Sequence, residues 1–216
     1  MNTAEKYGGQ AESWTKEAYA DPARYLRHRA ELVAELGPRL EREDSVLDLA
    51  CGDAGLAEPL LARGLRYLGV DLSEEMVAAA NRRLAGRAEA VLGDLNEFRP
   101  PEPVAATTCF RAIYYARDRL AFFRHVADFT ERKLVFDLNP RQYRLADVRT
   151  DLERAGFVDL TLRPFFVPQT RSLPEVVARG LEALERSGPP AQLLLRFRFT
   201  YLCAASPGTP VRHRRH

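Results

Sequence analysis

Acidic side chains lie in two apolar runs in the first third of the chain, and a glycine-containing turn separates the runs. The first run, Val46–Leu49, contains Asp48 and continues into Ala-Cys-Gly-Asp-Ala-Gly, which ends at Gly55. The second run, Tyr67–Ser73, contains Asp71. In open α/β sheets a strand, a glycine turn and a helix bind a nucleotide, and an acid about 20 residues later binds its ribose hydroxyls. The spacing therefore predicts a nucleotide-type site.

The charges beside the turn indicate which nucleotide. A dinucleotide needs the backbone N–H groups of such a turn for its pyrophosphate. Asp48 and Asp53 place two carboxylates there, and these would repel an anion but favour a ligand that carries an ammonium and a sulfonium. The chain also lacks the Tyr-x-x-x-Lys pair of short-chain dehydrogenases. Both observations favour S-adenosylmethionine over a dinucleotide.

Length and composition restrict the class of protein. The 216 residues suit one α/β domain, and the net charge of +2 is not that of a strongly basic nucleic-acid binder, so we expect no nucleic-acid partner. Cys51, Cys109 and Cys203 are far apart and form no CxxC pair, which favours buried, reduced thiols and no metal. Without an apolar run of membrane-spanning length or a signal-like start, we expect a cytoplasmic protein with no membrane partner.

The elements that must position these acids alternate between strands and helices. Apolar runs predict strands at 45–50, 66–71, 88–92, 104–110, 133–138 and 157–163. Helices are predicted to start at Asp21 and Ser73, both suited to N-caps, and to span 55–63, 118–130 and 147–155. This alternation is typical of an α/β fold with a doubly wound, mainly parallel sheet.

The last part of the chain departs from that alternation. Ser172–Glu175 fits a capping box that starts a helix ending at Gly188. Gln192–Tyr201 alternates apolar and polar residues, which predicts an antiparallel strand near the sheet edge. We expect one domain, 1–216, whose parts are an N-terminal helical cap (1–44), a cofactor-binding core (45–163), a lid insertion (164–190), a final strand (191–205) and a tail (206–216).

Several motifs in order resemble those of class I S-adenosylmethionine-dependent methyltransferases. The segments that carry the resemblance are Val46–Asp53, Gly69–Met76, Gly93–Leu95, Lys133–Asn139 and Leu152–Phe157. The resemblance covers roughly residues 45–163. It implies a Rossmann-like sheet of seven strands with an antiparallel last strand, S-adenosylmethionine as cofactor and S-adenosylhomocysteine as product.

The resemblance also implies a set of cofactor-binding residues. They are Asp48, Ala50, Gly52, Asp71, Leu72, Met76, Asp94, Leu95 and Phe110. By position, Asp48 and the Ala50–Gly52 backbone would hold the methionine part, Asp71 the ribose and Asp94 the adenine amino group. Leu72 and Met76 would contact the adenine, with Leu95 beside it and Phe110 under the sulfonium. These four apolar residues are equally consistent with core positions.

One departure concerns the turn itself. The family usually has glycine where this chain has Ala50 and Ala54. Because alanine tolerates positive φ poorly, we expect the turn to be displaced onto Gly55, with an effect on cofactor affinity.

The acceptor side offers weaker signals. Methyl transfer from a sulfonium mainly requires an acceptor atom held in line, so no catalytic triad is needed. Candidate catalytic residues are His28, Arg111 and Asp137. Arg29 is expected on a solvated face rather than at the methionine carboxylate, and His125 as a satisfied residue at the core edge.

We expect a small-molecule acceptor, compact and partly aromatic as in secondary metabolism. The segment Phe110–Tyr115 lacks the Asn-Pro-Pro-Tyr signature of several nucleic-acid and glutamine methyltransferases. Two alternatives stay open, namely a protein or RNA methyltransferase and a non-catalytic, cofactor-binding subunit. Neither the methylated atom nor the oligomeric state follows from the sequence.

Overall fold

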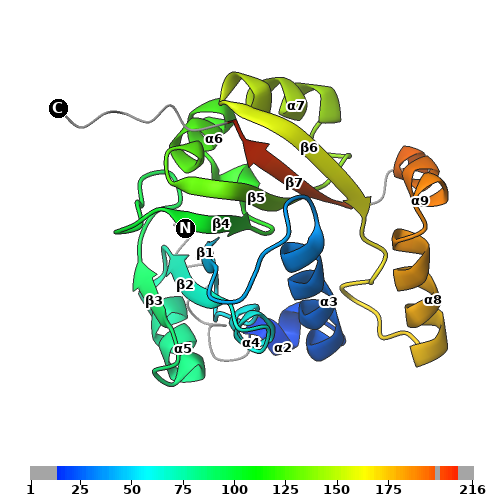
Figure 1. The fold of residues 1–216 in the computed structure, drawn as a ribbon. Coiled ribbons are helices and arrows are strands. Elements are labelled where there is room, and N and C mark those ends of the chain that lie inside the picture. The colour runs from blue at the N-terminus through cyan, green and yellow to red at the C-terminus, as the bar shows by residue number, and fades with distance from the viewer. Residues whose placement is uncertain (1–13, 198–199, 209–216) are drawn as a thin grey trace.

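A seven-stranded sheet forms the centre of the molecule (Figure 1). The computed structural model describes residues 14–197 and 200–208. The strand order is β3-β2-β1-β4-β5-β7-β6, and only the pairings of β7 are antiparallel among the strands described. The strands are β1 Ser45–Leu49, β2 Arg66–Asp71, β3 Glu89–Leu92, β4 Val104–Cys109, β5 Thr130–Leu138, β6 Phe157–Pro164 and β7 Tyr201–Pro207. The doubly wound, Rossmann-like architecture expected from the sequence is confirmed.

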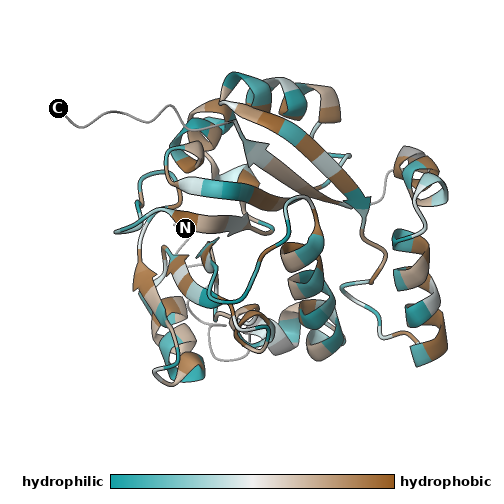
Figure 2. Ribbon diagram, in the orientation of Figure 1, coloured by the Kyte–Doolittle hydropathy of each residue, from teal (hydrophilic) through white to brown (hydrophobic). Residues whose placement is uncertain are grey.

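Helices cover both faces of this sheet. They are α2 Trp14–Ala18, α3 Pro22–Glu35, α4 Ala57–Leu61, α5 Glu74–Leu84, α6 Arg119–Ala127, α7 Leu145–Arg154, α8 Glu175–Glu185 and α9 Pro189–Leu194, with short 3-10 turns η1 Ile113–Tyr115 and η2 Leu195–Phe197. One buried cluster joins α3, α4 and α5 to the sheet, and a second joins α6 and α7. Figure 2 shows hydrophobic and hydrophilic residues side by side along these helices, as expected for helices with one buried face.

Side-chain caps fix the start of the helices that lead away from the site. The Asp21 carboxylate accepts a hydrogen bond of 3.1 Å from the Arg24 N–H at the start of α3. The Ser73 hydroxyl accepts one of 3.3 Å from the Met76 N–H at the start of α5. Both predicted N-caps are therefore confirmed, and each satisfies a backbone donor that the first helical turn leaves free.

The predicted final strand was wrong in its residue range. The strand expected at Gln192–Tyr201 is absent from residues 192–197, because 189–194 form α9 and 195–197 form η2, while 198 and 199 lie outside the described residues. The strand begins at Tyr201. It is antiparallel and lies between β5 and the edge strand β6, so the expected position near the sheet edge is confirmed. Its first five residues are buried, so it lacks the alternation of a half-solvated strand. The apolar residues of 192–197 belong instead to a helical segment.

The predicted capping box was also wrong. The N-cap of α8 is Pro174, with no side-chain hydrogen bond at the cap, and α8 ends at Glu185, before Gly188. The hydroxyl of Ser172 is therefore not the group that starts this helix.

Helix α8 is held against α3, which lies beside it in Figure 1. The buried Arg24 side chain pairs with Glu175 and Glu182. A second contact joins His28 Nε2 to the buried Glu185 carboxylate at 2.5 Å. Ion pairs therefore join the segments 14–35 and 175–185, and both segments contribute side chains to the cavities described below. No helix in the described ranges is long and apolar enough to cross a membrane.

Candidate active site

The turn after β1 adopts left-handed backbone conformations at two alanines. Ala50, Gly52 and Ala54 have φ of 59°, 57° and 54°. The expectation that the turn would be displaced onto Gly55 was wrong, since Gly55 is not among the residues with positive φ. Alanine is rarely found in this region, so the turn keeps its shape through its contacts. One of them is a hydrogen bond of 2.9 Å from the Cys51 N–H to the Val70 carbonyl.

Gly55 is required for a different reason, the close approach of the N-terminal segment. A Cβ atom at Gly55 would lie 3.1 Å from Leu26 Cδ1 and closer still to the Thr15 hydroxyl. Thr15 in turn donates its N–H to the Asp53 carboxylate at 3.2 Å, and Arg83 pairs with that carboxylate at 2.5 Å. Asp53 therefore joins α2 to the turn and is not an uncompensated charge beside it.

Asp48 lies buried at the end of β1 and faces the cavity. Tyr67 and Thr108 donate their hydroxyls to its two oxygens at 2.9 and 2.6 Å. Burial raises the pKa of Asp48 to about 6, against the effect of the two hydrogen bonds. Ionising the Asp48 carboxyl is thus costly, and a ligand that brings a positive charge would favour the ionised form.

Asp71 is the last residue of β2, and Asp94 lies two residues after β3. Asp71 accepts hydrogen bonds from the Gly52 and Ser73 N–H groups at 2.8 and 3.0 Å, yet burial still raises its pKa. Asp94 accepts from both the N–H and the side chain of Asn96 and pairs with Arg117. Although burial acts against them, these contacts lower the pKa of Asp94. Each acid is held in place with part of its accepting capacity still available to a ligand.

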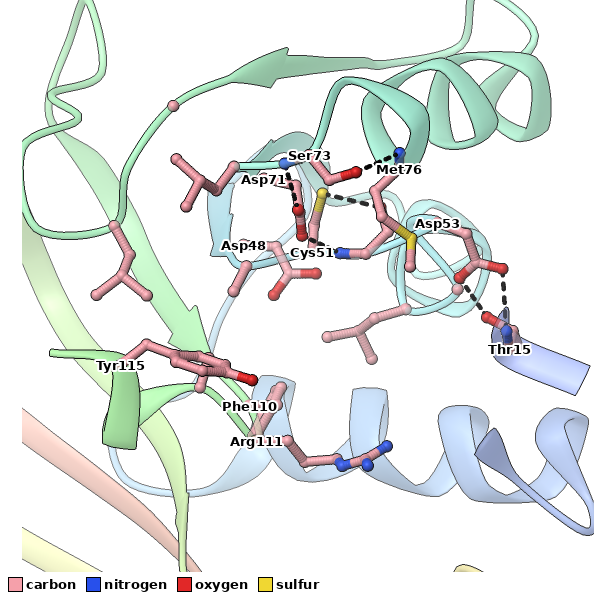
Figure 3. Close-up of a pocket in the computed structure, with 18 of the residues that line it drawn as sticks. Thr15, Asp48, Cys51, Asp53, Asp71, Ser73, Met76, Phe110, Arg111 and Tyr115 are labelled. Carbon is pink, nitrogen blue, oxygen red and sulfur yellow. Dashed lines mark hydrogen bonds between the residues drawn. The ribbon is translucent and has the colours of Figure 1, made fainter. Parts of the chain in front are cut away.

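A cavity of about 370 Å³ brings the predicted cofactor-binding residues together (Figure 3). All nine of them line it: Asp48, Ala50, Gly52, Asp71, Leu72, Met76, Asp94, Leu95 and Phe110. Met76 and Leu95 are buried in the wall, whereas Leu72 is 47% exposed. Leu72 is therefore not a core residue, and the remaining apolar positions both pack and face the cavity.

Arg29 was expected on a solvated face, and this expectation was wrong. It is buried, not solvated, and its guanidinium lies over the Phe110 ring with 4.3 Å from Cζ to the ring centre. It donates to the Tyr25 hydroxyl at 2.7 Å and to Asp137 at 3.3 Å, while its Nε has no hydrogen-bond partner. Burial alone would lower the pKa of Arg29, but Tyr25 and Asp137 raise it. The helical spacing of its neighbours Leu26 and Val33 was the available signal of a buried face.

A second cavity of about 700 Å³ adjoins the first. Arg111 and Tyr114 line both cavities, and Asp137 lines the second. Its apolar wall comes from the segment after β6 and from α8 and α9: Phe165, Phe166, Val167, Pro168, Leu181, Leu184 and Leu194. The structure thus brings two of the three candidate catalytic residues to the boundary between the cavities.

The third candidate, His28, lines neither cavity. Its ring lies between Glu185 and the Phe165 ring, with 5.4 Å between ring centres. We therefore do not assign it a role in chemistry. His125 Nε2 donates a hydrogen bond of 2.8 Å to the Phe98 carbonyl and the ring packs on Phe129, which confirms it as a satisfied residue at the core edge. No metal-binding group of three His, Cys, Asp or Glu occurs within 14–197 and 200–208.

Fold and site together define a class of protein. The strand order is 3-2-1-4-5-7-6, and acids at or near the carboxyl ends of β1, β2 and β3 line one cavity. This arrangement fits a ligand with a ribose, an adenine and a cationic end. Residues 46–133 match the family model described as a methyltransferase domain. The chain carries a class I S-adenosylmethionine-dependent methyltransferase domain, with S-adenosylmethionine as cofactor and S-adenosylhomocysteine as product. Comparison with curated proteins gives no significant sequence match.

Solved structures share the fold at low sequence identity. One is from a Haloferax volcanii complex between the Trm112 methyltransferase activator and a methyltransferase, at TM-score 0.69 and 17% identity over 98% of this chain and 100% of the other. A Clostridium acetobutylicum S-adenosylmethionine-dependent methyltransferase has TM-score 0.63 and 14% identity over 96% and 100%. Haemonchus contortus phosphoethanolamine N-methyltransferase 2, with S-adenosylmethionine, has TM-score 0.63 and 17% identity over 93% and 56%.

Proposed function

We propose that the chain transfers the methyl group of S-adenosylmethionine to a small, partly aromatic acceptor that binds in the second cavity. The observation that carries this proposal is the contact of the two cavities at Arg111 and Tyr114. An acceptor there would lie beside the cofactor, as an in-line displacement requires. The Haemonchus neighbour is a phosphoethanolamine N-methyltransferase, and phosphoethanolamine is a small molecule, which agrees with an acceptor of this size.

The residues of the first cavity fit the parts of the cofactor. Asp48 would attract the methionine ammonium, and Asp71 would accept from the ribose hydroxyls. Arg29 is the buried cation of this cavity and has an unpartnered Nε, so it would hold the methionine carboxylate. The cofactor supplies an electrophilic methyl group on a good leaving group, and the chain supplies binding, orientation and exclusion of water.

The proposed acceptor site depends on the apolar wall of the second cavity. Phe165 and Val167 are buried. Between them, the Phe166 N–H donates a hydrogen bond of 2.6 Å to Glu185, the last residue of α8, which ties this segment to the helix. A cavity with such a wall suits an apolar or aromatic body with few polar groups. The segments 14–35 and 164–194 would act together as its cover.

Calorimetric titration tests the cofactor site with two related ligands. S-adenosylhomocysteine carries the amino and carboxyl groups, and 5′-methylthioadenosine lacks both. For Arg29→Gln we expect the affinity for S-adenosylhomocysteine to fall by about 30-fold, as for a lost charge-assisted hydrogen bond, with 5′-methylthioadenosine little affected. Arg99→Gln, on an exposed ion pair with Asp128, is the control. Failure of the intact protein to bind either ligand would refute the proposed function.

A further inference from the structure

Arg29 connects the two cavities through its guanidinium. The residue itself lines the first cavity, whereas its two hydrogen-bond partners, Tyr25 and Asp137, line the second. Both partners accept from one nitrogen, Nη2, which lies 2.7 Å from the Tyr25 hydroxyl and 3.3 Å from Asp137 Oδ2. The buried Nε of the same guanidinium has no hydrogen-bond partner. Arg29 therefore holds the acceptor-side groups through Nη2 and keeps Nε available for another group.

A carboxylate bound at Nε would compete with Asp137 for Arg29. The planar guanidinium binds a carboxylate through two parallel hydrogen bonds, and the second donor beside Nε is Nη2. Tyr25 and Asp137 already accept from Nη2. The contact with Asp137 is the longer and therefore the weaker of the two, so a bound carboxylate would displace Asp137 first. The same carboxylate would offset the positive charge that attracts Asp137.

Asp137 keeps its position when this contact is lost, because its Oδ1 accepts a hydrogen bond of 2.7 Å from the Arg111 N–H. Its side chain is 11% exposed, so Oδ2 is accessible to a ligand in the second cavity. Among the described residues that line this cavity, Asp137 is the carboxylate, and there is no histidine, lysine or cysteine. Tyrosine is protonated at neutral pH, and burial raises the pKa of Tyr25 to about 12, although the Arg29 charge acts against it. Asp137 is thus the group in this lining that can take up a proton near neutral pH.

The second cavity also favours one kind of proton-bearing acceptor. A protonated amine would be repelled by a bound sulfonium, whereas a neutral phenol would not. Phe165, Val167 and Leu181 contribute to an apolar wall that suits an aromatic ring. A phenol is a much stronger acid than an aliphatic alcohol, so its proton passes more readily to a carboxylate.

We propose that the acceptor is a phenol, that its proton passes to Asp137 Oδ2 during methyl transfer, and that the cofactor carboxylate makes this oxygen available by pairing with Arg29. This inference rests on the proposed function and deepens it. The phenol oxygen forms a bond to the methyl carbon as the bond from carbon to sulfur breaks, and the electron pair stays on sulfur. Asp137 receives the proton and releases it to water. The products are a methyl aryl ether, a neutral thioether and one proton.

The first test measures binding and needs no turnover. The probes are 4-methylphenol and 2-naphthol, each compared with its methyl ether, which has no proton to donate. They are titrated into protein saturated with S-adenosylhomocysteine or with decarboxylated S-adenosylhomocysteine, which keeps the amino group and lacks the carboxylate. We expect at least one phenol to bind about tenfold more tightly in the presence of the carboxylate, and the ethers to show no such difference. In Arg29→Gln the difference should disappear, because Asp137 then has no cationic partner in either complex.

The second test uses Asp137→Asn, which can still accept from the Arg111 N–H but cannot take up a proton. With methyl-labelled S-adenosylmethionine at about pH 8.5, kcat/KM should fall by about 100-fold for 4-methylphenol, which is protonated at that pH. It should fall by less than about tenfold for 4-nitrophenol, which is already ionised and needs no base. The affinity for S-adenosylhomocysteine should stay equal or rise, because Asp137 competes with the cofactor carboxylate for Arg29. Asp128→Asn, at an exposed ion pair, should match the parent chain.

The outcomes separate this inference from the cofactor assignment. A purely structural role of Asp137 would lower activity on both phenols alike and would weaken S-adenosylhomocysteine binding. That result, a phenol affinity that does not depend on the cofactor carboxylate, or the absence of labelled ether from every probe would overturn the inference. Failure of the parent chain to bind S-adenosylhomocysteine would instead refute the cofactor assignment and with it the proposed function.

Discussion

The Gly52 N–H donates a hydrogen bond of 2.8 Å to the Asp71 carboxylate, so the end of β2 fixes the turn that follows β1. The same carboxylate accepts from the Ser73 N–H at 3.0 Å, one residue before α5 begins. Asp71 therefore joins two strands and a helix start at the point where the ribose is proposed to bind. Its substitution should affect both the turn and the ligand.

Replacing Asp71 with asparagine separates these two roles. Asparagine keeps one accepting oxygen but loses the charge, so we expect the free energy of unfolding to fall by about 1 kcal/mol. The affinity for 5′-methylthioadenosine, which retains the ribose, should fall by about 10- to 100-fold. Denaturant unfolding and calorimetry measure the two effects. Asp128→Asn, at an exposed ion pair, is the control, and unchanged nucleoside affinity in Asp71→Asn would remove Asp71 from the ribose site.

Asp48 should make cofactor binding depend on pH. Because burial raises its pKa to about 6, Asp48 is largely protonated below that pH, and a protonated carboxyl attracts an ammonium only weakly. The affinity for S-adenosylhomocysteine should therefore rise as the pH increases from 5 to 7 and then level off. Calorimetry across this range checks the prediction. In Asp48→Asn the affinity should be low and independent of pH, and an equally steep rise in that variant would exclude Asp48 as the titrating group.

The raised pKa of Asp48 should also make the stability of the ligand-free protein depend on pH. Its stability should fall as the pH rises, whereas ligand affinity should rise. The pKa of Asp48 is higher in the folded chain than its usual value of 3.8, so the folded state binds the proton more tightly. The free energy of unfolding should fall as the pH rises from about 4 to about 6, by at most about 3 kcal/mol for a shift of this size. Urea unfolding at several pH values gives the free energy of unfolding of the parent chain and of Asp48→Asn. The difference between the two should change over this pH range. A difference that is the same at every pH would contradict the prediction.

Sequence patterns predicted which acids share one cavity because local rules act there. Asp48, Asp71 and Asp94 lie at or just beyond the carboxyl ends of three paired parallel strands, and parallel strands bring these ends to one edge of the sheet. The turn was harder, because Ala50 and Ala54 adopt left-handed conformations that only tertiary contacts hold. Local propensity favoured Gly55, but its role comes from the approach of Thr15 and Leu26.

The acceptor side could not be read from the chain in the same way. The alternation in 192–197 resembles a strand, yet α9 packs beside β6 while the strand lies further on, at Tyr201–Pro207. Arg29 and Asp137 are 108 residues apart and meet only in the folded chain. No short-range pattern predicts such a pair, and the burial of Arg29 against aromatic rings depends on the same long-range packing.

Lys133 provides a test of how α3 is held to the sheet. It is fully buried in β5, and its Nζ donates to the Leu36 and Ala34 carbonyls at 2.7 and 3.3 Å, at the C-terminal end of α3. Burial lowers the pKa of Lys133 to about 7. Above that pH the folded state favours the neutral amine while the unfolded chain still binds the proton. Stability should therefore rise between about pH 7 and 9, by at most about 1.4 kcal/mol per pH unit.

Comparison with Lys133→Met isolates this contribution. Methionine has a similar length and no titrating group, so its unfolding free energy should lack the rise, although the carbonyls of α3 lose a donor. Urea unfolding at pH 6.5, 7.5 and 8.5 provides the measurement. The interpretation of Lys133 is wrong if the variant rises with pH as steeply as the parent chain.

Arg24 should control the cover over the second cavity. Its buried guanidinium pairs with Glu175 and Glu182 on α8, and such a pair is costly to break from one side because the remaining charges stay partly buried. In Arg24→Gln we expect α8 amides to exchange hydrogen faster, by about tenfold or more, and KM for the acceptor to rise. The affinity for S-adenosylhomocysteine should stay within about twofold, since neither Arg24 nor α8 lines the first cavity. Arg179→Gln breaks an exposed pair within α8 and is the matched control. If both variants exchange alike, the ion pairs of Arg24 do not hold the cover, and the packing of Leu181 and Leu184 at the second cavity must do so.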